Sequence, residues 1–308
     1  MWLANLEETI VACRQALAEE DLAEVGRLLR NAGVTDEELA SLVARIANRE
    51  FDASGWSRLA GVCAKGGIQE QSWRLQRYVL LRVGLQRLAR VSDLPVVDEV
   101  KQRLYGHLQF IARPDPEDAA ILNPQGSGFQ GLCAYVLQEK FSAGQLDWVV
   151  SGFARSWLLK IPLRDVPRFI YGVYRRAGGP KPYFVPHTPI RRELPILTEE
   201  DERRAMRVIA ASMALQPDIR AFLSSSWWLD PQLAAVSPHM AWLARWMEEC
   251  RRFGALITIL GPAPPNSGYL VGDHRRRAMY ESGQWKPVNG ILFWPRRDLL
   301  SWLKDQGG

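Results

Sequence analysis

A tyrosine at the end of an expected helix is the residue of this chain best placed to move a proton. Tyr280 stands in the run Met279-Tyr280-Glu281-Ser282-Gly283-Gln284-Trp285, where a glycine ends the helix and an aromatic residue follows. A phenol can deliver its proton to a leaving group that lies within hydrogen-bond reach. Tyr280 is therefore a candidate general acid, and packing of the helix onto a sheet is the alternative role.

Asp230 and His187 are the candidates for assisting a nucleophile. Asp230 ends an apolar run and precedes Pro231, so its carboxylate could orient a substrate amine or begin a turn. His187 lies between Pro186 and Pro189 and close to two arginines, which suits a general base or an anion contact. An ordered loop residue is the alternative for His187.

A small anion site is predicted at the start of a later helix. We expect Ser237 to cap this helix with Pro238 at its first position, and His239 lies one residue further. Helix N-termini bind anions through their backbone N–H groups and dipole. Ser237, His239 and Asn266, which lies in the loop 261–268, form the candidate cofactor-binding set. The alternative is a plain N-cap beside a surface imidazole.

Other chemical patterns are weaker. Gly126-Ser127-Gly128-Phe129-Gln130-Gly131 matches a phosphate-binding loop, but the strand that should precede it is short and poor. The run Arg275–Arg277 makes a solvated helix face more than a nucleic-acid surface, because Asp273 and Glu281 flank it. The histidines show no paired spacing, so no metal site is expected.

The C-terminal third positions these residues on alternating strands and helices. We expect strands over 219–228, 255–260 and 290–294, with helices starting at Ser237 and Asp273 and a last helix over 297–304. This order, with the turn Trp228-Leu229-Asp230-Pro231 and the Tyr280–Trp285 pattern, resembles the second half of the GNAT-type N-acyltransferase fold. The family's glycine-bearing pyrophosphate loop has no counterpart in Pro231–Met240, which contains no glycine.

The resemblance carries specific implications. It implies a mixed sheet with a ligand cleft where strands splay after Asp230. It also implies acyl transfer to a small amine-containing substrate from acetyl-CoA or another acyl donor. Tyr280 would then protonate the departing thiolate, and Asp230 or His187 would aid the nucleophile. A non-catalytic binding or adaptor protein that recruits a partner through its N-terminal helices remains open, and nucleic-acid binding is a weaker alternative.

The remainder of the chain reads as helical. Helices are expected over 3–31, 35–50, 69–90 and 94–111, with a capping box at Thr35 and Glu38. Further helices are expected over 129–141 and 146–159, and a helix from Glu199 capped by Thr198. The fold class is therefore α+β: a helical domain over 1–112, a helical connecting region over 113–180 and a GNAT-like α/β domain over 181–308.

The composition of the chain limits the classes of function that these patterns can indicate. The chain has 308 residues and a net charge of +5, which is compatible with an anionic ligand but too weak to indicate nucleic acid alone. Four widely spaced cysteines predict neither disulfides nor a cysteine zinc site. We see no signal peptide and no apolar run of membrane-spanning length, so a cytoplasmic protein without a membrane partner is expected. The late tryptophans predict either a large aromatic core or an aromatic ligand wall.

Overall fold

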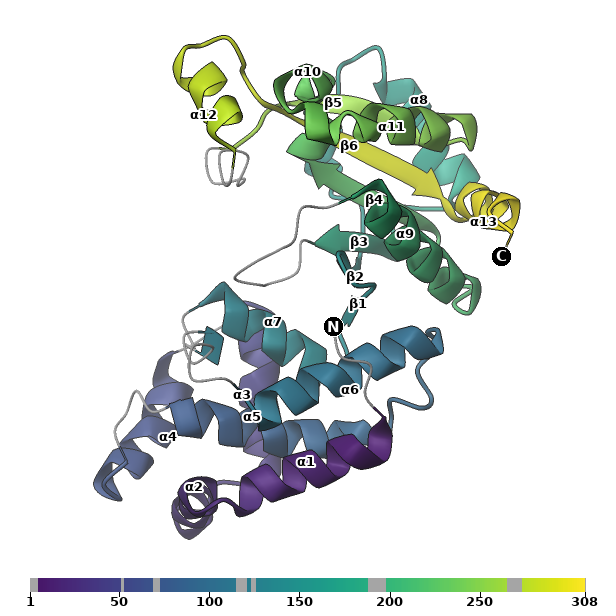
Figure 1. Ribbon diagram of the computed structural model, residues 1–308. Helices are drawn as coiled ribbons and strands as arrows, with labels where there is room; N and C mark the ends of the chain where they lie inside the picture. The colour runs from purple at the N-terminus through teal and green to yellow at the C-terminus, as the bar shows by residue number, and fades with distance from the viewer. Residues whose placement is uncertain are drawn as a thin grey trace. The chain divides into compact units, whose positions relative to one another are not determined.

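The computed structural model describes residues 5–50, 53–68, 73–114, 121–122, 126–187, 198–264 and 273–307 (Figure 1). The chain divides into two compact units. Unit 1 comprises Met1–Gly144 with Pro189–Arg192, and unit 2 comprises Gln145–Thr188 with Glu193–Gly308. A helical N-terminal part followed by a mixed sheet confirms the expected α+β class.

Unit 1 is a helical array around one buried helix. Its elements are α1 (Leu6–Ala18), α2 (Glu20–Asn31), α3 (Asp36–Ala47), α4 (Ala53–Lys65), α5 (Trp73–Leu88), α6 (Asp98–Ala112), α7 (Ser127–Val136) and the short strand β1 (Lys140–Ser142). Helix α5 packs against α1, α2, α3, α6 and α7, and it is buried on nearly all sides. A helix that is surrounded in this way forms the centre of a core.

Most helices of unit 1 lie where local sequence patterns predict them. The capping box at the start of α3 is confirmed, since Thr35 Oγ1 accepts from the Glu38 amide and Glu38 accepts from the Thr35 amide. The single helix expected over 3–31 is wrong, because Glu19 adopts an extended conformation (φ −56°, ψ 138°) between α1 and α2. The Glu19 carboxylate accepts from Arg77 of α5 at 2.9 Å, which holds this break against the core.

Unit 2 contains a mixed sheet with helices on both faces. Its strands are β2 (Asp147–Ser151), β3 (Tyr183–His187), β4 (Ala221–Ser226), β5 (Leu256–Pro262) and β6 (Val288–Pro295). Their order in the sheet is β2-β3-β4-β6-β5, and only β3 and β4 run parallel to each other. The helical elements are η2 (Arg155–Trp157), α8 (Val166–Tyr171), the π-helical turn η3 (Gly172–Arg176), α9 (Glu199–Ala214), η4 (Trp227–Leu229), α10 (Leu233–Val236), η5 (Pro238–Met240), α11 (Trp242–Arg252), α12 (His274–Glu281) and α13 (Arg296–Asp305).

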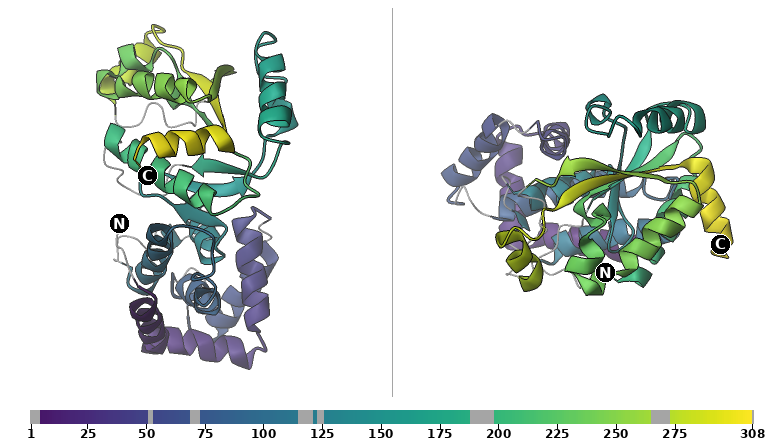
Figure 2. Two further views of the ribbon diagram at one scale, coloured as in Figure 1. Left: turned by 90° about the vertical axis from the view of Figure 1, so that its right-hand side faces the viewer. Right: turned by 90° about the horizontal axis from the view of Figure 1, so that it is seen from above.

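The period-two alternation of the strands divides their side chains between two apolar layers. On one face Tyr183, Leu223 and Phe293 pack with Phe169 and Val173, which come from α8 and η3. On the other face lie α9, α11 and α13 (Figure 2). There Trp246, Trp294 and Trp302 form a cluster with ring centroids 5.5–6.1 Å apart, so the aromatic core expected from the late tryptophans is present.

Three expected elements of this part of the chain are wrong. Residues 146–159 contain strand β2 in place of a helix, and the helix expected over 129–141 ends at Val136 before β1. The region 113–180 therefore is not helical throughout. Residues 147–151 form a strand because they pair with the distant strand β3. Trp148 aligns with Pro186 and Val150 with Phe184 in an antiparallel ladder. The helix expected from Ser237 starts later, since α11 begins at Trp242.

Candidate ligand-binding site

The parallel ladder between β3 and β4 is short, and this shortness creates the site. Only two residue pairs align, Tyr183 with Ala221 and Phe184 with Phe222. Strand β3 continues to His187 and β4 continues to Ser226, each held on its other side by an antiparallel neighbour. The two strands therefore diverge after Phe184 and Phe222. The resemblance implied a splay after Asp230, and the divergence begins eight residues earlier.

A cavity of about 560 Å³ opens at this divergence, within unit 2. Pro186 and His187 of β3 line it on one side and Ser224, Ser225 and Ser226 of β4 on the other. Its walls also include four indole rings and two thioethers, from Trp227, Trp228, Trp246, Trp294, Met206 and Met247. This size and apolar lining with a few polar groups is typical of a small-molecule site. The tryptophans thus form an aromatic core and also line this cavity, and a ligand-binding role for them stays a prediction.

One carboxyl group that lines this cavity has an oxygen atom without a hydrogen-bond partner among the described residues. Glu202, in the first turn of α9, is 9% exposed, and its Oε2 atom finds no hydrogen-bond partner among the described residues. Burial raises the pKa of this carboxyl to about 7. The amide oxygen of Asn289, another lining residue, also lacks a partner in the described part of the chain. Buried polar atoms without partners are rare and mark places where a ligand or water completes the site.

The electrostatic character of the cavity follows from its lining. It includes Glu202 and His187, and no lysine or arginine is among the described residues that line it. The thiol of Cys250 also borders the cavity, and burial raises its pKa, so the thiol stays protonated and unreactive as a nucleophile. The cavity therefore suits an apolar group and a hydrogen-bonding centre, and its described lining offers no lysine or arginine for a phosphate.

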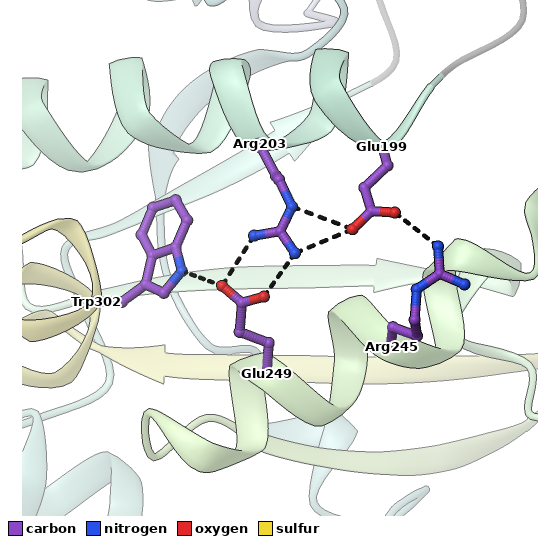
Figure 3. A network of polar contacts seen from close by, with 5 residues as sticks. All are labelled: Glu199, Arg203, Arg245, Glu249 and Trp302. Carbon is purple, nitrogen blue, oxygen red and sulfur yellow. Dashed lines mark hydrogen bonds and ion pairs between the residues drawn. The ribbon is translucent and has the colours of Figure 1, made fainter. Parts of the chain in front are cut away.

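A polar network locks the two helices that carry the cavity walls (Figure 3). Arg203 of α9 donates to both oxygens of Glu249 on α11, at 2.9 and 2.6 Å, and it also contacts Glu199. Trp302 of α13 donates to Glu249 at 2.8 Å, and Arg245 donates to Glu199 at 2.8 Å. The hydrogen bonds from Arg203 lower the pKa of Glu249, so the carboxylate stays ionised. Because Arg203 on α9 is bonded to Glu249 on α11, the network holds the two helices together. It thereby fixes the position of Glu202 relative to Trp246 and Met247.

Asp230 has a full set of contacts inside the fold. It is 2% exposed, and its Oδ1 atom accepts from the Gln232 amide at 2.8 Å. Its Oδ2 atom accepts from the indole N–H of Trp285 at 3.0 Å and from the Val288 amide at 3.1 Å. These contacts are those of an aspartate that begins a turn, which is the second of the two roles predicted for Asp230. They also tie the end of η4 to the start of β6.

Ser237 and His239 lie at η5 rather than at the start of a long helix. The Ser237 hydroxyl, 1% exposed, donates to Oδ2 of Asp273 at 2.8 Å. Burial acts to raise the pKa of Asp273, but hydrogen bonds from the Arg276 amide and Ser237 outweigh it and lower the pKa. Ser237 is therefore already bonded to an ionised carboxylate, which repels a second anion. His239 is exposed on the same turn.

The remaining predicted residues lie elsewhere. Tyr280 is 37% exposed on α12, and it is not among the described residues that line the cavity. Asn266 lies outside the described residues. Of the predicted residues that the structure describes, His187 alone lines the cavity, at its β3 end.

Sequence reasoning missed Glu202. Acidic residues in the first turn of a helix complement its dipole, so Glu202 does not stand out from its neighbours Glu199, Glu200 and Asp201. The spacing held a second signal. Glu202, Met206, Ile209 and Met213 recur at helical intervals and are all buried, so the carboxyl lies on the apolar stripe of its helix.

The start of helix α9 does not offer a usual phosphate site. Helix α9 has four acidic residues in its first turn, from Glu199 to Glu202. These carboxylates complement the helix dipole and oppose an incoming pyrophosphate. Among the described residues, no group of three or more His, Cys, Asp or Glu side chains is arranged to hold a metal ion. No helix of the described residues is long and apolar enough to cross a bilayer.

Comparisons with known proteins give a structural similarity alone. No protein-family model matches the chain, and no curated protein matches it. A solved acyltransferase in complex with decanoyl-CoA and teicoplanin is similar at 15% identity and a TM-score of 0.46, over 84% of this chain and 76% of that chain. An acyltransferase mutant in complex with octanoyl-CoA gives 14% identity and a TM-score of 0.47, over 96% and 90% of the two chains.

Proposed function

We propose that unit 2 is an acyltransferase-like domain that moves an acyl group from a thioester to a small amine. The observation that carries this proposal is the divergence of the parallel strands β3 and β4 beside a cavity of about 560 Å³. The resemblance of the C-terminal third to GNAT-type enzymes supports the same reading. It is a resemblance in the order of elements and in the Tyr280–Trp285 pattern.

The diverging strands suit an extended donor that carries amide groups. Beyond Phe184 and Phe222, the residues of β3 and β4 are not paired with each other. An extended chain with amides, such as the pantetheine arm of an acyl carrier, can hydrogen-bond to such edges as an added strand does. The acyl chain would then enter the cavity between Trp246, Trp294 and Met206. Burial of an apolar chain there adds affinity in proportion to its length.

Glu202 is the residue we assign to proton transfer. A carboxyl with a pKa near 7 holds its proton loosely at neutral pH, which is the property of an effective general base. Ionised Glu202 takes a proton from the amine as its nitrogen attacks the thioester carbonyl carbon. The tetrahedral intermediate then expels the thiolate, and an amide is formed. His187 at the cavity mouth is the second candidate base, and Tyr280 as the acid for the thiolate stays a prediction.

A binding protein without catalysis is the second candidate function. The acidic first turn of α9 and the Ser237–Asp273 contact favour it, because neither leaves a helix start for a pyrophosphate. The donor would therefore be held mainly through its acyl and pantetheine parts. An adaptor role of unit 1 for a protein partner likewise stays a prediction, as does a cytoplasmic location.

Binding and turnover can be tested separately. Titration of the full chain with acetyl-CoA, octanoyl-CoA and decanoyl-CoA, and with the matching acyl-pantetheine thioesters, should change the tryptophan emission, because four indoles line the cavity. We expect tighter binding with longer chains and a small difference between CoA and pantetheine forms. Ser224→Phe should abolish the response by filling the cavity, whereas Ser282→Phe, on the exposed end of α12, should leave it unchanged.

Thiol release in the presence of an amine panel then distinguishes the two candidates. Glu202→Gln should retain donor binding and lower the rate of release by about 100-fold or more, the usual contribution of a general base. Donor binding without any thiol release would favour the binding protein. Absence of binding by every thioester would contradict the proposal itself.

A further inference from the structure

One stretch of unit 2 concentrates the large hydrophobic side chains that are exposed in the described chain. Of the ten large hydrophobic side chains exposed among the described residues, five lie within sixteen positions of each other. These are Leu159 and Leu163, each 89% exposed, and Tyr171, Tyr174 and Ile170, which are 60%, 49% and 43% exposed. Single exposed hydrophobic residues are common on proteins, but a concentration of this kind marks an interaction surface.

The fold holds these side chains outward. Ile161, Phe169 and Val173 of the same stretch are buried in the core cluster on one face of the sheet. Trp157, Leu158 and Val166 pack against that cluster as well. Because both the turn over 158–165 and α8 are anchored inward by these residues, their outward sides face away from the same sheet face (Figure 2). Leu159, Leu163 and Tyr171 cannot turn inward without displacing the core.

Exposed basic side chains alternate with the exposed hydrophobic ones along this stretch. Lys160, Arg164, Arg168 and Arg175 are all exposed in this stretch. Its single acid, Asp165, accepts a hydrogen bond from Thr258 at 2.5 Å, and Arg176 is paired with Asp298, also at 2.5 Å. The outward surface therefore carries protruding leucines and tyrosines among four cations. We call Leu159, Lys160, Leu163, Arg164, Arg168, Ile170, Tyr171, Tyr174 and Arg175 the apolar–basic surface.

We propose that the apolar–basic surface docks on the surface of an anionic lipid bilayer. Leucines that protrude enter the acyl boundary, tyrosines lie at the headgroup level, and lysine and arginine heads remain with the lipid phosphates. Such docking needs no membrane-spanning helix, so it is compatible with the helices of the described chain. It differs from the sequence-based expectation of no membrane partner, which considered spanning segments alone.

Charge argues against a second copy of the chain as the occupant. A two-fold interface places the same patch on both sides, so it would oppose the four cations of one copy to the four of the other. Like charges that face each other destabilise an interface. An anionic bilayer offers the complementary charge together with an apolar interior for the leucines.

Vesicle co-sedimentation of the full chain tests this proposal. We expect the protein to pellet with phosphatidylcholine vesicles that contain roughly 30 mol% phosphatidylglycerol, and far less with phosphatidylcholine alone. Raising the salt from about 0.1 M to 0.5 M should weaken binding several-fold, because exposed charges are screened. The Lys160→Gln, Arg164→Gln, Arg168→Gln triple variant should lose on the order of five-fold per charge.

The apolar contribution needs its own variants. Leu159→Ser combined with Leu163→Ser should weaken vesicle binding by at least about ten-fold, and stability should be unchanged because both side chains are 89% exposed. Leu215→Ser, a change of the same chemistry at a 52% exposed position after α9, should bind as the natural chain does. Equal binding by the double variant and Leu215→Ser would overturn the proposal, as would failure to bind anionic vesicles. A wild-type dimer that the double variant separates in sedimentation velocity would assign the surface to a second copy instead.

Discussion

Two buried ionisable residues, one in each unit, are treated in opposite ways by the fold. Arg77 of α5 is 5% exposed, and its guanidinium meets Glu19 and the carbonyl oxygens of Ile111 and Ala112. Glu202 of α9 is 9% exposed, and one of its oxygens has no partner in the described residues. A buried charge that the fold satisfies is part of the structure. A buried ionisable group with an oxygen left unpartnered among the described residues is the position at which our proposal places a ligand, and stability measurements can separate the two.

Removal of Arg77 should have the largest effect on stability. Arg77→Ala leaves two buried carbonyl oxygens without a donor, and we expect a loss of about 3 kcal/mol in the free energy of unfolding. Urea unfolding followed by the helical circular dichroism signal measures it. Arg82→Ala is the control on the same helix, because its pair with Asp36 is more than a third exposed on both sides and contributes about 0–1 kcal/mol. Equal losses in the two variants would contradict the assigned role of Arg77.

Removal of the Glu202 charge should have the opposite sign. The pKa of Glu202 is raised to about 7 by burial, so between about pH 4.5 and 7 the folded chain binds a proton that the unfolded chain has lost. Stability therefore falls as pH rises through this window and stays lower above it. Glu202→Gln, which is neutral and of the same shape, should be stabilised relative to the natural chain by up to about 3 kcal/mol at pH 8. Near pH 4 the two should be alike.

Thermal unfolding of both proteins across pH 4–8 gives this comparison. A stability difference between the two proteins that does not change with pH across this window would contradict the raised pKa of Glu202. A rise in stability on adding the acyl donor, larger in the natural chain than in the variant, would connect the open carboxyl to the ligand.

The sequence predicted what is local and missed what depends on register. The capping box at Thr35 and the N-cap at Thr198 involve residues three apart, and both are confirmed. Strand β2 owes its conformation to β3, some forty residues away, so no local pattern revealed it. The cavity depends on how few residues of β3 and β4 align, which only tertiary structure decides. Glu202 is the exception, because its place on an apolar helical stripe could have been read.

Substitution of Ser237 should change stability the least, and it tests whether this residue is structural or binds a ligand. If its role is structural, Ser237→Ala removes one buried hydrogen bond to Asp273 and costs about 1 kcal/mol at pH 7, with no change in thioester binding. The pKa of Asp273 is lowered in the folded chain, so the stability that this carboxylate contributes is present above its unfolded pKa and is lost as pH falls through the folded pKa. The cost of Ser237→Ala should therefore shrink in acid, because protonated Asp273 no longer needs the hydroxyl donor. Chemical unfolding at pH 7 and at about pH 3 measures both values. If the variant instead keeps its stability and loses affinity for acyl-CoA but not for acyl-pantetheine, Ser237 contacts the phosphates, and the sequence-based anion site would be restored.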